Sequence, residues 1–357
     1  MVSFGTHRTV RNALAALALV GLAIGAAGCA ADTAPSTGEP TASADVLRIG
    51  YQSASDYGLF YLAQEEGWFE KAGLKVELSL FDSGDAQIEA LAGGSIDVTL
   101  QGAQPPLLAM QRGTADIRLL GPIADSAGLF SIVASSDIHS VKDLKGKKVA
   151  VTAGTAYDFY LDNVLEKFGM AADSVQKIDL QPLDGQGSFL SQQVDAVVPL
   201  ATSRYLILDK VPDANVIFAS GDFEKDPNPS TFSLYDLMVT TSQVTDAKAD
   251  ALQKLVDVFY GTVIPYVQDA KNHDELVKKL YDWQANVLKA PTSEKDVAAQ
   301  IDSYGFYDVE RAKKAMSSGE FTEQITAQAN FLVSTGKLPS LPAITDMTDT
   351  PFISQMK

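Results

Sequence analysis

The residue types that most often carry out chemistry are scarce in this sequence. It holds three histidines, His7, His139 and His273, and a single cysteine, Cys29. One cysteine excludes an intramolecular disulfide, and so few scattered histidines argue against a metal centre of the usual kind. The glycine-rich nucleotide loops, the G-x-S-x-G elbow and the H-E-x-x-H motif are all missing. The sequence therefore predicts binding without turnover, with no catalytic residue, metal or cofactor.

Four polar loops are the best candidates for a binding site. They cover residues 52–57, 101–104, 152–157 and 199–203, each directly after a predicted strand. In open α/β sheets, ligands bind beyond the carboxyl ends of the strands. From these loops and the residues near them we predict the ligand-binding set Gln52, Ser53, Tyr57, Gly102, Gln104, Asp125, Gly154, Thr155, Ala156, Tyr157 and Thr202.

Three of these loops lead into helices, whose first amides favour an anion. We expect a sulfonate or carboxylate on Gly154, Thr155 and Ala156, and the alternative is a plain helix cap at Thr155. Asp56 and Asp125 could hold an amine of a zwitterion, or they could only cap turns. Aromatic residues beside the loops could stack on a ring or simply pack in the core; they are Tyr51, Tyr57, Phe130, Tyr157 and Tyr160.

The composition sets the class of protein. The chain has 357 residues and a formal net charge of −17, so a nucleic-acid partner is not expected. Hydrophobic residues make up 46% and charged residues 20%, which is typical of a globular protein with a large core. The length is enough for about two domains.

Residues 1–28 are typical of a secretion signal, with Arg8 and Arg11 before an apolar run and small residues at its end. The segment around Ala26, Gly28 and Cys29 resembles a bacterial lipoprotein lipobox, although the family pattern prefers leucine where Ala26 stands. An ordinary signal peptide is the alternative. The resemblance implies cleavage before Cys29, a lipid on its sulfur, and anchoring at the extracytoplasmic face of the cell membrane. Residues 29–45 then form a flexible tether.

The body alternates strands and helices as far as residue 240, which indicates parallel βαβ units. Strands are expected near 46–50, 76–80, 96–100, 117–120, 129–134, 148–151, 175–180, 194–198, 216–218 and 234–240. After Ala247 only helices are expected, near 247–270, 272–288, 293–303, 308–316 and 320–335. This pattern fits two α/β lobes, with the chain returning to the first lobe near residues 234–240. We predict a discontinuous lobe 1 of residues 46–134 plus 236–357, whose helical tail packs on it, and a lobe 2 of residues 135–235.

Several sequence blocks carry a family resemblance. They are LRIGYQ at 47–52, EEGWFEKAGL at 65–74, ALAGGSID at 90–97 and VKDLKGKKVA at 141–150. These blocks resemble the nitrate/sulfonate/taurine group of ABC-importer substrate-binding proteins, which is akin to the binders of thiamine pyrimidine precursors. The resemblance implies a type II periplasmic-binding-protein-like α/β fold, with a mainly parallel sheet flanked by helices in each lobe. It also implies a two-lobed clamp that closes on a small ligand and delivers it to permease subunits. We expect the protein to act as a monomer.

The ligand itself stays open at this level. A small organic anion or zwitterion is the main prediction, and an aromatic heterocycle such as a pyrimidine precursor of thiamine is the alternative. A ligand-sensing module for a signalling partner and an enzyme of the same fold are further alternatives. Many relatives carry a Trp-x-Pro-type segment where this chain has Val198-Pro199-Leu200, so the pocket floor is expected to differ. The pyrimidine synthases of this fold need His and Cys residues that this chain lacks.

Overall fold

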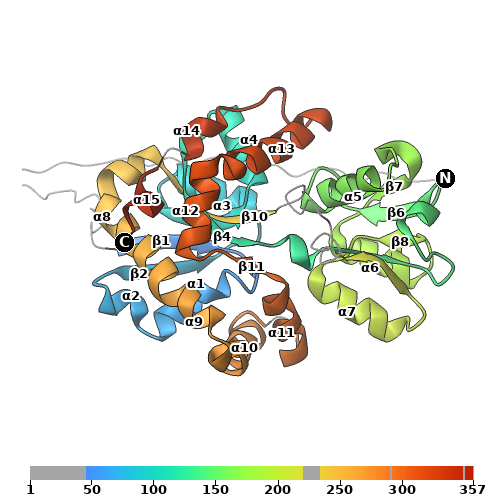
Figure 1. Cartoon of the computed structure of the whole chain (residues 1–357), viewed down its shortest axis with the longest axis horizontal. Helices are drawn as coiled ribbons and strands as arrows, with labels where there is room; N and C mark the ends of the chain where they lie inside the picture. Colours follow the sequence, from blue (N-terminus) through green and yellow to red (C-terminus); the bar gives the residue numbers. More distant parts are fainter. Residues whose placement is uncertain (1–45, 220–233, 290–291, 349, 357) are drawn as a thin grey trace, which may run out of the picture. The chain divides into compact units, whose positions relative to one another are not determined.

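The strands form two separate sheets in the computed structural model, which describes residues 46–219, 234–289, 292–348 and 350–356 (Figure 1). The predicted signal segment, the tether and Cys29 lie outside the described residues. The six-stranded sheet has the order β11 (Gly305–Phe306), β4 (Ile117–Asp125), β10 (Tyr235–Thr241), β3 (Val98–Gly102), β1 (Val46–Tyr51) and β2 (Lys75–Leu80). The five-stranded sheet has the order β7 (Gln176–Asp179), β6 (Lys148–Val151), β8 (Ala196–Val197), β5 (Ser131–Ala134) and β9 (Asn215–Ala219).

Most strands run in one direction, as the βαβ pattern predicts. Strand β1 pairs in parallel with β2 and β3, and β6 pairs in parallel with β7 and β8. Strand β10 lies antiparallel between β3 and β4, and β5 lies antiparallel between β8 and β9. The mixed α/β fold with two mainly parallel sheets is therefore confirmed.

One predicted lobe boundary and one predicted absence of strands need correction. Residues 131–134 were assigned to the first lobe, but β5 pairs with β8 and β9 of the five-stranded sheet. No strand was expected after Ala247, yet β11 pairs with the end of β4. Strand β11 has only two residues, which is too short to leave an alternating pattern in the sequence.

Helices connect the strands of both sheets. The first sheet carries α1 (Gly58–Glu65), α2 (Trp68–Lys71), α3 (Gly84–Ala92) and α4 (Gln104–Arg112), and the second carries α5 (Ala156–Lys167), α6 (Pro182–Leu190) and α7 (Ala201–Lys210). The Ser83 hydroxyl accepts a hydrogen bond from the Ala86 amide at 3.2 Å and caps the start of α3. Pro105 and Pro106 occupy the first turn of α4, where proline is tolerated.

The chain after β10 is almost entirely helical. It forms α8 (Ser242–Val258), α9 (Ile264–Gln268), α10 (His273–Asp282), α11 (Glu294–Ser303), α12 (Val309–Ser318), α13 (Glu320–Ser334), α14 (Ile344–Thr348) and α15 (Phe352–Gln355). Helices α8, α14 and α15 pack on β4, and the Phe259 ring stacks on Phe60 of α1 at 4.9 Å. The prediction that the helical tail packs on the first sheet is therefore confirmed. Among the residues described, none of the helices combines the length and the apolar character that a bilayer crossing demands.

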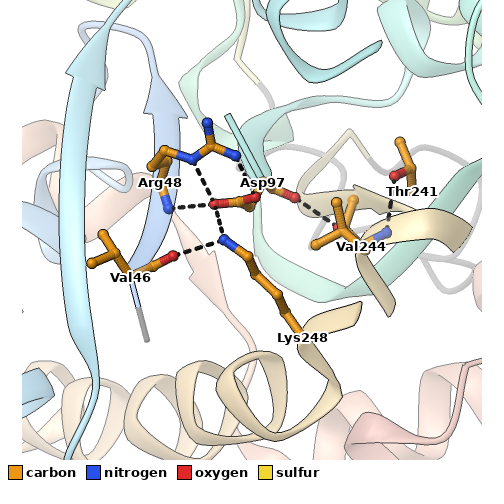
Figure 2. A network of polar contacts seen from close by, with 7 residues as sticks. Val46, Arg48, Asp97, Thr241, Val244 and Lys248 are labelled. Atoms are coloured by element: carbon orange, nitrogen blue, oxygen red, sulfur yellow. Dashed lines mark hydrogen bonds and ion pairs between the residues drawn. The ribbon is translucent and has the colours of Figure 1, made fainter. Parts of the chain in front are cut away.

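A buried charge network ties the tail to the first strand (Figure 2). The Asp97 carboxylate accepts hydrogen bonds from the Arg48 guanidinium at 2.8 and 3.0 Å and from the Lys248 ammonium at 2.9 Å. Lys248 also donates to the Val46 carbonyl at 2.8 Å. Burial opposes ionisation of Asp97, but the hydrogen bonds from Arg48 and Lys248 outweigh it and hold the pKa of Asp97 below its usual value.

Candidate functional site

The candidate site is a cavity of about 490 Å³ at the carboxyl ends of strands from both sheets. Residues after β1 and β3 form one wall, and the start of α5, which follows β6, forms another. Strand β10 and the helical tail complete the lining. The residues around the cavity include Gln52, Ser53, Ala54, Gln101, Gly102, Gln104, Ser126, Phe130, Thr155, Ala156, Tyr157, Leu200, Tyr235, Asp236, Gln300, Tyr304 and Gln328.

The structure brings seven of the predicted ligand-binding residues together around this cavity. They come from three of the four loops that the sequence singles out, and they are Gln52, Ser53, Gly102, Gln104, Thr155, Ala156 and Tyr157. The fourth loop contributes Leu200 instead of the predicted Thr202. Thr202 falls within α7, but its side chain lies outside the described part of the chain.

Three predicted ligand-binding residues do not line the cavity. The Asp125 carboxylate accepts hydrogen bonds from the amides of Ala127 at 2.9 Å and Leu234 at 3.0 Å, which is the loop-capping alternative. The Gly154 amide donates to the Asp158 carboxylate at 2.8 Å, so a side chain of the same helix occupies it. Tyr57 is buried, and its hydroxyl donates a hydrogen bond to the Asp236 carboxylate at 2.8 Å.

The start of α5 is therefore only partly the anion site that we predict. Thr155 precedes the helix, but its hydroxyl donates to the Thr152 carbonyl at 2.6 Å and does not cap a helical amide. The first amides of a helix have no acceptor within the helix. The start of the helix, with Ala156 and Tyr157 at the cavity, remains the part of this segment suited to an anion.

The aromatic residues divide between cavity and core. Phe130 and Tyr157 line the cavity, with ring centroids 4.9 Å apart. Tyr160 is fully buried beside Phe130 and Phe218, and Tyr51 packs against Trp283. The core alternative therefore holds for Tyr160 and Tyr51.

Sequence analysis missed Asp236 and Tyr304, which line the cavity and pair with Tyr57 and Asp56 beside it. Asp236 of β10 lines the cavity, and its Oδ1 accepts the hydrogen bond from Tyr57. Asp56 is fully buried, and its Oδ1 accepts a hydrogen bond from Tyr304 at 2.9 Å. Burial, followed by the charge of Asp236, raises the pKa of Asp56 well above its usual value. Burial also raises the pKa of Asp236, to about 6.

Three of the glutamines that line the cavity have amide atoms without a hydrogen-bond partner among the described residues. Gln101 is 1% exposed, and neither its Nε2 nor its Oε1 has a hydrogen-bond partner among the described residues. The Nε2 atoms of Gln104 and Gln300 likewise lack partners there. Gln284 donates to the Ser55 hydroxyl at 2.6 Å, and Ser55 donates to the Gln300 Oε1 at 2.8 Å. These two hydrogen bonds hold the Gln300 side-chain oxygen in place, so the Gln300 amide nitrogen is available to a ligand.

The described residues contain no cluster of three or more histidine, cysteine, aspartate or glutamate side chains that could bind a metal ion. The polar groups of the cavity are instead neutral amides, hydroxyls and one carboxylate. Such groups bind and orient an organic molecule through hydrogen bonds.

Comparisons with known proteins agree with this arrangement. A Bacillus subtilis (strain 168) relative with the name "Putative aliphatic sulfonates-binding protein" is 34% identical over 249 residues, which is 68% of this chain and 72% of the relative. The "Taurine-binding periplasmic protein" of Escherichia coli (strain K12) is 27% identical over 138 residues, which is 38% of this chain and 42% of that protein.

The fold is that of a known periplasmic protein. The periplasmic aliphatic sulphonate binding protein SsuA from Escherichia coli superposes with a TM-score of 0.67 at 20% identity, over 85% of this chain and 91% of SsuA. The family model described as "NMT1/THI5 like" matches residues 54–281, which hold much of the cavity lining. The chain therefore belongs to the NMT1/THI5-like family.

Proposed function

We propose that this protein is the solute-binding component of an ABC importer, which captures a small organic anion or zwitterion of the sulfonate, taurine or nitrate class. The observation that carries the proposal is the cavity, where unpartnered glutamine amides and the start of a helix face the same space. Amide donors of this kind suit the oxygens of a sulfonate. Family membership and the names of the relatives support the same function.

The mechanism that we propose is closure of two lobes on the ligand. The lobes correspond to the two sheets, each with its own helices, and both contribute to the cavity. A ligand that contacts both lobes favours the closed arrangement by its differential affinity, and closure is a common switching mode of such proteins. The permease binds the closed form, and the ligand is released to it chemically unchanged.

We further propose that the protein acts outside the cytoplasm as a monomer, held to the membrane by a lipid on Cys29. The support is the sequence before the described residues, where an apolar run ends in small residues at the sole cysteine. Inhibition of the lipoprotein signal peptidase in the producing cells tests the anchor. We expect an unprocessed precursor to accumulate, and unchanged processing would contradict lipidation.

A thermal-shift screen tests the ligand class. The compounds are taurine, ethanesulfonate, nitrate, a simple carboxylate and an aminopyrimidine. A ligand that binds only the folded state stabilises it by about 2.7 kcal/mol at one hundred times Kd, and Tm therefore rises with ligand concentration. We expect a shift with a sulfonate, and mass spectrometry of the recovered compound should show no change in mass. A shift with the aminopyrimidine alone would overturn the assignment.

A further inference from the structure

The charge of the cavity lining points to a ligand group that a plain organic anion does not have. Among the described residues that line the cavity, Asp236 is the one with a carboxylate, and none carries an ammonium or guanidinium group. A part-buried carboxylate without a cation beside it is stabilised by a partner of opposite charge. A nitrate or an alkylsulfonate would bring a second negative charge to this carboxylate.

No cation neutralises Asp236 among the described groups that surround it. Its carboxylate faces Asp56, Tyr57, Asp125, Tyr157 and Tyr304, none of which is a cation. Burial raises the pKa of Asp56 well above its usual value and that of Asp236 to about 6. Of these two acids, Asp236 lines the cavity and Asp56 does not, so the Asp236 carboxylate is the one that a ligand can reach.

Aromatic rings lie around the same carboxylate. Phe130, Tyr157, Tyr235 and Tyr304 all line the cavity together with Asp236. Ring faces attract ammonium groups, and the attraction grows where water is excluded. The amides of Gln101, Gln104 and Gln300 supply donors for the other end of a molecule.

We propose that Asp236 receives a protonated amine of the ligand, with the amide donors on its anionic end. This inference rests on the proposed function and narrows its substrate class to aminoalkanesulfonates and related zwitterions. It also replaces Asp56 and Asp125, the residues that the sequence suggests for an amine, with a residue of β10.

A matched pair of compounds isolates the amine. Taurine and 2-hydroxyethanesulfonate share the sulfonate and the chain length and differ in the amine. Calorimetry should give taurine an affinity at least about tenfold higher in the wild-type protein, as expected for a charged hydrogen bond. Asp236→Asn should remove this preference, whereas Asp250→Asn, the same charge change at an exposed position of α8, should keep it. Equal affinities in the wild type, or an unchanged preference in Asp236→Asn, would overturn the inference.

A second pair, β-alanine and 3-hydroxypropanoate, separates the two proposals. If neither sulfonate binds but β-alanine binds with dependence on Asp236, the sulfonate assignment falls and the amine site stands. If both sulfonates bind equally, the proposed function stands and the amine site falls; if no amine binds, the amine site falls as well.

Should Asp236→Asn fail to fold, the wild-type preference for taurine should decrease as the pH is lowered through about 6. A preference that is constant with pH would contradict the inference.

Discussion

At the scale of single residues, the structure separates a carboxylate that is paired with cations from two that are held by tyrosines at or beside the cavity. Asp97 has cationic partners and a lowered pKa, whereas Asp56 and Asp236 have tyrosine partners and raised pKa values. Sequence reasoning could not make this distinction, because Asp56 meets Tyr304 across 248 positions of the chain. Asp236 lies inside a strand that the sequence does predict, but nothing in its neighbours shows which cavity it lines.

Replacing Asp97 should destabilise the protein. Asp97→Asn leaves the Arg48 and Lys248 charges without their counter-charge, and we expect a loss of about 3 kcal/mol in the free energy of unfolding at pH 7. The lowered pKa means that this contribution is present above about pH 4 and disappears as the pH falls further. Urea unfolding measures both effects. The matched control is Asp137→Asn at an exposed ion pair, which should change stability far less; equal losses would contradict the role of Asp97.

Asp236 should have the opposite pH dependence. Its pKa is raised from 3.8 to about 6 in the folded protein, so its contribution to stability is complete below about pH 4 and is lost as the pH rises through 6. Relative to Asp236→Asn, the ligand-free wild type should lose roughly 3 kcal/mol between pH 4 and pH 7. Urea unfolding of both proteins at these pH values measures the difference. A difference that does not vary with pH would show that Asp236 is not held in a charge-poor environment.

At the scale of elements, loops after strands proved to be the informative part of the sequence. Three of the four predicted loops reach the cavity because the carboxyl ends of parallel strands lie at one edge of a sheet. The contributions of α11 and α13, through Gln300 and Gln328, were not predicted. An amphipathic helix shows in its sequence which face is buried, but not which neighbour covers it.

The first residue of α3 tests how an element positions a ligand group. A Cβ atom on Gly84 would lie 2.8 Å from the Gln101 Oε1 and 2.7 Å from Pro105, so Gly84→Ala should displace the Gln101 amide. We expect ligand affinity to fall about two- to tenfold, the value of one neutral hydrogen bond. Calorimetry measures it. Gly187→Ala in α6, where a Cβ meets open space, is the control and should bind normally; an unaffected Gly84→Ala would exclude Gln101 from recognition.

At the scale of the whole molecule, the helical tail contacts helices that belong to both sheets. Phe331 of α13 packs on Phe159 of α5 at 5.1 Å, and the Lys337 side chain lies over Gly154. Sequence analysis predicted the tail on the first sheet, but the contacts with α5 depend on tertiary packing that no local pattern encodes. These contacts belong to the segments that closure of the two lobes would move.

Closure should be visible in solution. If the lobes close on the ligand, small-angle X-ray scattering of the protein saturated with ligand should give a smaller radius of gyration than the ligand-free protein. The physical reason is that a ligand in contact with both lobes stabilises the closed arrangement. Superimposable scattering profiles at saturation would contradict the closure mechanism without excluding binding.

The most direct test of the account is calorimetry on a protein whose cavity is filled. Gly102 lines the cavity with nothing closer to an added Cβ than the Tyr235 carbonyl at 4.0 Å, so the Cβ of Gly102→Trp meets no clash and its ring adds bulk at the cavity. The account predicts one sulfonate or zwitterion bound per wild-type chain, and no measurable binding by a Gly102→Trp protein that unfolds at a normal temperature. Undiminished binding by the folded variant would show that the ligand binds elsewhere and would contradict the central claim.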